Sequence, residues 1–160
     1  SFYQMLILKR LLKNCTAMDN HKTRSIITFS ILLYAIVVPF MEINGTHVFN
    51  PNWTPHVRIH EVWQLITNSG IGLFCIWLVW GKNETKISAI LSLLVTGGFL
   101  VAFMLQEFYG GSMKYLDGSE KQLLGINIGV LGFGIAFALV LYTLLVHKFK
   151  RTNNVRRNEI

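Results

Sequence analysis

Charged side chains are scarce in this chain of 160 residues: Asp, Glu, Lys and Arg make up 14% of it, against 52% hydrophobic residues. A soluble domain of this size needs more solvating side chains, so the composition argues against one and against a nucleic-acid-binding module. Proline is rare as well, with three residues, which excludes collagen-like segments. The two cysteines, Cys15 and Cys75, form no CxxC pair, which excludes a disulfide framework and a thiol redox motif.

What the sequence does contain is four long apolar runs, each close to the roughly 20 residues that cross a bilayer as a helix. They predict an all-α polytopic membrane protein, a four-transmembrane-helix bundle, with no room for a second folded domain. The predicted spans are residues 26–43, 62–80, 87–105 and 123–146, within a transmembrane domain over 26–147. Pro39 predicts a bend near the end of the first span, where a neighbouring helix can satisfy the carbonyl that the proline leaves free.

The basic residues predict the orientation of the spans. Of the 15 Lys and Arg residues, five precede the first span, two lie between the second and third spans, and five follow the fourth. Only Arg58, Lys114 and Lys121 lie in the other two loops. By the positive-inside rule, both termini are expected to be cytoplasmic and loops 44–60 and 108–122 to be outside. The formal net charge of +7 is therefore mainly a topology signal.

Two basic segments flank the predicted transmembrane domain. Residues 1–25 form a basic N-terminal segment, in which Met18 looks like a natural beginning. Residues 1–17 are therefore expected to be either a processed or added extension or an interfacial amphipathic helix. Residues 148–160 form a basic cytoplasmic tail that is expected to lie against the lipid surface.

Polar side chains gather at the predicted outer ends of the spans, where burial in lipid is costly and therefore suggests function. Glu42 closes the first span and Glu107 the third. Glu61, Gln64 and Asn68 open the second span at i, i+3 and i+7, which predicts one helical face. Glu42 ends the first span, which is predicted to run outward, and Glu61 begins the second span, which runs back inward. The two side chains should therefore face each other. Carboxylates brought together at low dielectric cannot all ionise, so one should stay protonated as a general acid.

These residues define a hypothetical site. The candidate catalytic residues are Glu42, Glu61 and, as a complementary base, His60. The candidate ligand-binding residues are Gln64, Asn68, Trp63, Glu107 and Arg58. The alternative is that the carboxylates lie at the headgroup boundary, solvated or paired with Arg58 or Lys114.

The loop between the first two spans holds three histidines and two prolines within residues 47–60. Thr54 and Pro55 are a helix-start signal, so the second helix should begin there, with His56 and His60 at i, i+4 pointing toward the bundle mouth. That spacing could hold a metal together with His47, but the pattern differs from HExxH. We therefore expect hydrogen bonding at these histidines, with no metal and no other cofactor.

Three short motifs resemble the EXPERA group, four-helix membrane proteins that include the emopamil-binding sterol isomerase and the sigma-two receptor. They are Phe40-Met41-Glu42, Glu61-Val-Trp-Gln64 and Leu105-Gln106-Glu107. The resemblance implies a cavity that opens to the bilayer and acidic groups for a cationic or carbocation-like centre in a sterol or terpenoid. It also implies that Glu42, Glu61 and His60 act on that centre. The histidine-rich loop is not a pattern of that group.

The leading expectation is a multi-pass integral membrane protein that binds a lipid-like ligand near the extracytoplasmic leaflet. By acid–base chemistry, it could act as an isomerase or cyclase. The alternative is a non-enzymatic accessory subunit of a larger membrane complex. That subunit, or a homo-oligomer, would assemble through a small-residue face of the fourth span formed by Gly125, Gly129, Gly132 and Ala136.

Overall fold

The computed structural model describes residues 21–115 and 117–158, with residues 147–158 described by their backbone alone. Four of its helical runs are long and apolar enough to cross a membrane. They are His21–Glu42, Pro55–Lys82, Thr85–Tyr109 and Ile128–Val146. The expectation of a mostly helical protein with four candidate membrane spans is therefore confirmed. The expectations for residues 1–17 lie outside the described residues.

The first three spans are built from consecutive helical elements. The first span joins α2 (His21–Leu32), the π-helical turn η1 (Leu33–Val37) and α3 (Val38–Glu42). The second joins α4 (Pro55–Ile76) and the π-helical turn η2 (Trp77–Lys82), and the third joins α5 (Thr85–Leu105) and the 3-10 turn η3 (Gln106–Tyr109). The fourth span is the first part of α6 (Ile128–Asn158), which follows an antiparallel hairpin of β1 (Gln122–Leu123) and β2 (Ile126–Asn127).

The hairpin corrects the predicted start of the fourth span, which is Ile128 and not residue 123. Leu124 and Gly125 form the turn, with φ of 55° and 77°, so Gly125 does not lie on the helix. The apolar run did not reveal this because a short apolar stretch fits a strand as well as a helix. The rest of the small-residue face packs inside the chain: Ala136 is fully buried, and a Cβ at Gly132 would lie 3.7 Å from Leu33.

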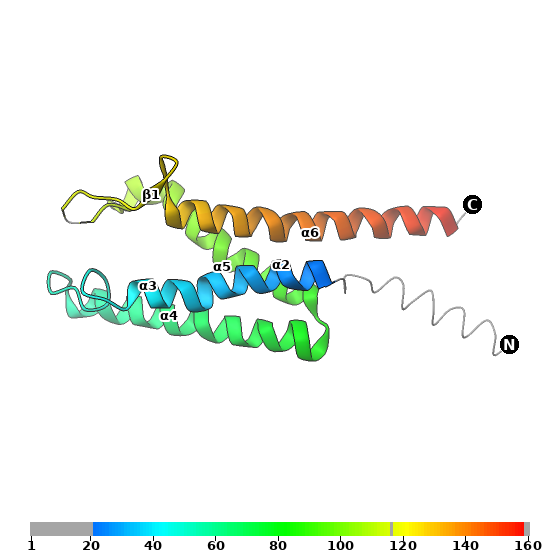
Figure 1. The fold of residues 1–160 in the computed structure, drawn as a ribbon, viewed down its shortest axis with the longest axis horizontal. Helices are drawn as coiled ribbons and strands as arrows, with labels where there is room; N and C mark the ends of the chain where they lie inside the picture. Colours follow the sequence, from blue (N-terminus) through cyan, green and yellow to red (C-terminus); the bar gives the residue numbers. More distant parts are fainter. Residues whose placement is uncertain (1–20, 116, 159–160) are drawn as a thin grey trace.

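Figure 1 shows the spans running roughly alongside one another, with α5 passing obliquely behind α2. α4 packs against α2, η1 and α5, whereas α6 packs mainly against α2 and α5. Residues 43–54, 110–115 and 117–127 lie at one end of the bundle, which we call the loop end. The start of α2 and the end of α6 lie at the opposite end.

The link between the second and third spans is very short, consisting of Asn83 and Glu84. Asn83 adopts a left-handed conformation (φ 60°), and its side-chain oxygen accepts a hydrogen bond of 2.6 Å from the guanidinium of Arg24. The indole N–H of Trp80 donates to the hydroxyl of Thr28 at 3.1 Å. These contacts attach the linked pair of helices to α2.

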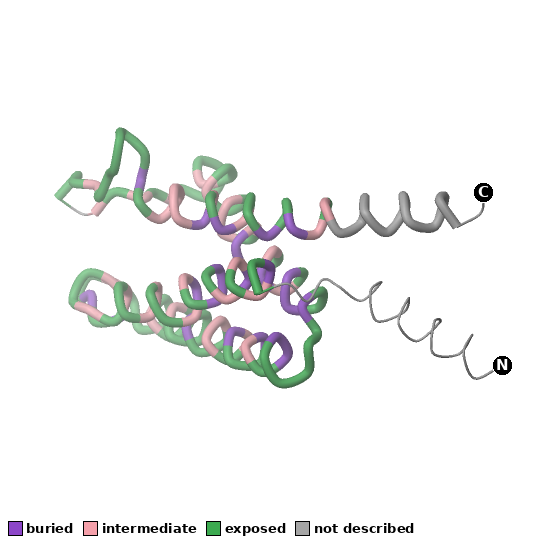
Figure 2. Tube along the Cα trace, turned by 45° about the vertical axis from the view of Figure 1, so that its right-hand side comes forward, coloured by how far each residue is buried: buried purple, intermediate pink, exposed green. Residues whose placement is uncertain are grey.

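The buried residues lie on the stretches where the spans face one another, as the colouring of the tube in Figure 2 shows. The apolar core comprises Ile27, Ile31, Tyr34, Cys75, Val79, Ala89, Phe133 and Val140. The inward face of α5 is small and hydroxylated, with Thr85, Ser88, Ser92 and Thr96 all buried. Small side chains let helices approach closely in lipid, where burial of apolar surface alone gives little driving force.

The first span departs from regular α-helix close to Pro39. The π-helical turn η1 lies directly before α3, the segment that contains Pro39. A proline at position 39 has no N–H to donate to the carbonyl of Ala35, four residues earlier. The hydroxyl of Ser69 on α4 donates to that carbonyl at 3.0 Å. A neighbouring helix therefore satisfies the freed carbonyl, as expected.

The Ser69 hydrogen bond should matter only while Pro39 is present. We expect Ser69→Ala to lower the free energy of unfolding by about 0.6 kcal/mol, and by at most about 1.7, the range for such bonds between membrane helices. In a Pro39→Ala background, the backbone N–H gained at position 39 can serve the same carbonyl, so Ser69→Ala should cost less. A double-mutant cycle by reversible unfolding in micelles measures the difference, and equal losses in both backgrounds would contradict the assignment.

Candidate functional site

A carboxylate–histidine pair stands at the loop end of the first span. Glu42 is the last residue of α3, and Nε2 of His47 lies 3.0 Å from its Oε2. Each side chain is 26% exposed, so the pair is largely shielded from solvent. A tight turn returns the chain to the helix: the side-chain oxygen of Asn44 accepts the N–H of Thr46 at 2.7 Å. The Asn44 amide nitrogen donates to the carbonyl of Met41.

Glu61 on α4 is a third member of this cluster. The charges of Glu42 and His47 both act on Glu61, so the structure places the two acids within electrostatic reach of each other. Lys121, which directly precedes the hairpin, acts on both Glu42 and His47. Two carboxylates and one histidine therefore lie within electrostatic reach of one another, and a lysine from the second long loop acts on two of them. We call Glu42, His47 and Glu61 the acid–histidine cluster.

The surroundings of His47 favour its neutral form. Burial lowers the pKa of the imidazole below its ordinary value, while the charge of Glu61 opposes the shift and that of Lys121 adds to it. The ring lies edge-on to Trp53 and Tyr115, with centroid distances of 5.8 and 6.0 Å. A lowered pKa means that the imidazole is deprotonated at a lower pH than an exposed histidine.

The second helix begins where the sequence predicts it. The hydroxyl of Thr54 accepts the N–H of Val57 at 3.4 Å, and Pro55 is the first helical residue. His56 and His60 consequently share a face, with their Nε2 atoms 3.1 Å apart. One of these nitrogens must carry the hydrogen that the other accepts. The expected helical extension and hydrogen bond are both present.

The histidines of the first loop form two pairs of contacts. His47 pairs with Glu42, and His56 pairs with His60. Among the side chains of residues 21–115 and 117–146, no group of three or more His, Cys, Asp or Glu residues is placed to hold a metal ion.

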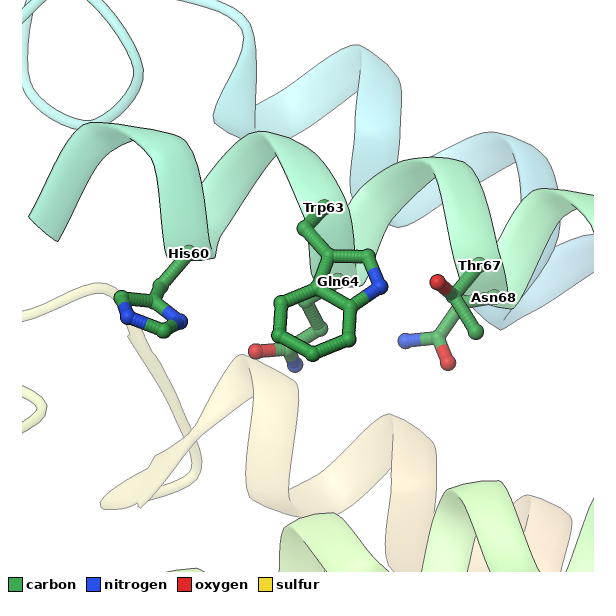
Figure 3. A pocket seen from close by; sticks show the side chains of 5 residues that line it. All are labelled: His60, Trp63, Gln64, Thr67 and Asn68. Atoms are coloured by element: carbon green, nitrogen blue, oxygen red, sulfur yellow. The ribbon is translucent and has the colours of Figure 1, made fainter. Parts of the chain in front are cut away.

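A hollow of about 320 Å³ lies on α4, the helix that carries Glu61. It is lined by His60, Trp63, Gln64, Thr67 and Asn68. Figure 3 shows these side chains projecting from α4 toward the start of α6. The side chain of Trp63 is exposed, and its ring lies 5.9 Å from that of His60. The hollow therefore combines an aromatic wall with an imidazole and two amides.

The residues of the predicted polar face of α4 contribute to two different features, the hollow and the acid–histidine cluster. Gln64 and Asn68 line the hollow, whereas Glu61 does not and interacts with Glu42 and His47. The sequence reasoning missed Thr67, although its i+3 spacing from Gln64 on the same helix was a usable signal. It also considered His47 only as a metal candidate. The Asn-Gly turn that follows Glu42 was the available signal for their contact.

Two other candidate residues, Glu107 and Arg58, are not among the charged groups that act on the cluster. Glu107, in η3, is exposed and is not among the charges that act on His47 or Glu61. Arg58 is partly buried, and its Nε has no hydrogen-bond partner among the residues that the structure describes. Among the described residues, Glu42 pairs with His47 and not with Arg58 or Lys114.

The structure thus assembles an acid–base pair and a second acid at one end of a four-span bundle, and the helix that carries the second acid also carries an amphipathic hollow. The resemblance to the EXPERA group stays a prediction, because comparison of this chain with known protein families, curated proteins and solved structures finds no match.

Proposed function

We propose that this membrane protein binds a lipid-like small molecule with a cationic head at the loop end of the bundle. The observation that carries the proposal is that Glu61, which interacts with Glu42 and His47, lies on α4 one helical turn from Gln64, which lines the hollow. The cluster holds two carboxylates, and one lysine, Lys121, acts on it, so the balance of charge favours a cation. The volume of the hollow, about 320 Å³, lies at the lower end of the range for small-molecule sites.

Each wall of the site would contribute a different interaction. Glu61 supplies a charge-assisted hydrogen bond to a protonated amine, and the face of Trp63 supplies apolar and cation–π contact. Gln64 and Asn68 add hydrogen-bonding groups that would fix the orientation of the head. The Glu42–His47 pair could transfer a proton to or from the ligand. That step would support isomerisation or cyclisation of a sterol or terpenoid, the chemistry that the EXPERA resemblance implies.

A cationic amphiphile tests this proposal directly. We expect N,N-dimethyldodecylamine to bind the protein in lipid nanodiscs more strongly than 1-dodecanol, as measured by isothermal titration calorimetry against empty nanodiscs. Glu61→Gln keeps the shape of the side chain but removes its charge, so it should weaken amine binding about tenfold or more. Glu84→Gln is the matched control because Glu84 lies at the opposite end of the bundle.

Two results would count against the function. Equal affinity for the amine and the alcohol would show that no acidic group recognises the head. Equal loss of affinity in Glu61→Gln and Glu84→Gln would show that the effect is one of overall membrane charge.

We also propose that the loop end faces away from the cytoplasm, which follows from the distribution of Lys and Arg. In a variant whose native cysteines are replaced, an impermeant thiol reagent added to intact cells should label a cysteine at Ser112. It should not label one at Asn154. Permeabilised cells, in which both sites should react, provide the control. Labelling at Asn154 alone in intact cells would invert the orientation.

A further inference from the structure

The hydroxyl of Thr46 lies between two polar groups, and the geometry determines to which of them it donates its hydrogen. Its Oγ1 is 2.6 Å from Oδ1 of Asn44 and 2.9 Å from Nδ1 of His47. The orientation of the Asn44 amide is fixed by its other contacts. Oδ1 accepts the N–H of Thr46 at 2.7 Å, and the amide nitrogen donates to the carbonyl of Met41.

This arrangement sets the tautomer of His47. An amide oxygen can only accept, so the single hydrogen of the Thr46 hydroxyl must point toward Asn44. The hydroxyl oxygen then offers only lone pairs to His47, and Nδ1 must carry a hydrogen to complete the contact. On the opposite side of the ring, Nε2 faces Oε2 of Glu42 at 3.0 Å.

We propose that His47 keeps its Nδ1 hydrogen throughout and that the Glu42–His47 contact holds one exchangeable proton that the two residues gain and lose as a unit. In the protonated pair this proton sits on Nε2, giving an ion pair, or moves to Oε2, giving a neutral acid and a neutral imidazole. When it leaves, two acceptors face each other and the contact opens. Asn44 and Thr46 are therefore positioning residues, which aim the basic nitrogen at Glu42.

The charges around the pair determine what proton loss does. Glu42, Glu61 and Lys121 act on His47, and the ring of Tyr115 packs against it. Losing the shared proton leaves the pair with one negative charge in addition to that of an ionised Glu61. A cationic ligand would favour this state, so its binding would release a proton. That consequence rests on the proposed function, whereas the tautomer does not.

The tautomer can be read in the ligand-free protein. In samples labelled with ¹⁵N at histidine, the two ring nitrogens of His47 report which of them carries hydrogen, and the loss of signals in His47→Gln assigns them. We expect Nδ1 to remain protonated across a pH titration while the Nε2 signal shifts. Thr46→Val removes the hydroxyl at nearly constant shape on an exposed residue, so a fraction with Nε2–H and bare Nδ1 should appear. Thr46→Ser should restore the original tautomer.

Two outcomes would overturn the inference. One is a bare Nδ1 in the unmodified protein at alkaline pH. The other is a Thr46→Val spectrum in which the His47 nitrogens behave as in the unmodified protein. A failure of the amine to bind, with the tautomer as described, would instead remove the proposed function and leave this inference standing.

Discussion

Gly72→Ala should lower the free energy of unfolding by about 1–3 kcal/mol, the usual cost of overpacking a tight core. A Cβ at Gly72 would lie 2.3 Å from Cβ of Ala35 and 3.3 Å from Cγ2 of Ile31. No flexible side-chain end is available to move aside at Ala35, so α4 and η1 must separate. Gly70→Ala on the same helix should be tolerated, because no other described residue lies within 4 Å of its added Cβ.

The Gly72 clash has a specific remedy that tests its cause. Ala35→Gly removes the methyl group that the new Cβ meets, so the double variant should recover much of the stability lost in Gly72→Ala. Reversible unfolding of the four proteins in micelles gives the coupling energy. If Gly70→Ala destabilised as much as Gly72→Ala, the close approach of these helices would not be the reason.

Asn127→Ala should also be costly, by about 1–2 kcal/mol, because Asn127 caps the start of α6. Its Oδ1 accepts the N–H groups of Gly129 at 2.8 Å and Val130 at 3.3 Å. Its amide nitrogen donates to Glu120 at 3.0 Å, next to the Lys121 that acts on the acid–histidine cluster. Losing this residue should therefore loosen both the helix start and the segment that precedes it.

A serine at position 127 separates these two effects. Asn127→Ser keeps an acceptor for the helix N–H groups but cannot reach Glu120 in the same way, so it should retain most of the stability. Thermal unfolding of both variants provides the measurement. A loss in Asn127→Ser equal to that in Asn127→Ala would assign the stability to the Glu120 contact and not to the cap.

Much of the fold could be predicted because it depends on local signals. Four apolar runs indicated the four candidate spans, and Thr54 with Pro55 indicated where the second helix begins. The proximity of Glu42 and Glu61 followed from the order of the spans. The hairpin at 122–127 could not be predicted in this way, because its leucines and isoleucine continue the apolar pattern of the following helix.

The details of the site were harder to predict because they depend on where neighbouring helices stand around α4. Helical spacing placed Glu61, Gln64 and Asn68 on one face of α4. It could not show that Glu61 interacts with Glu42 and His47 while Gln64 and Asn68 line the hollow. The partner of His47 depends on how the turn at Asn44 folds back onto α3. Spacing along the chain describes one element at a time, whereas these contacts join different elements.

The two-residue link at Asn83 and Glu84 bears on how the chain enters the bilayer. The entropy cost of closing a loop grows with its length, so pairing α4 with α5 across this link costs far less than pairing α2 with α6. The second and third spans therefore form a helical hairpin that needs no distant contact to bring its arms together. The hollow lies on α4, which is one arm of this hairpin. The α4 side of the site therefore belongs to the part of the fold whose helices are joined by the two-residue link.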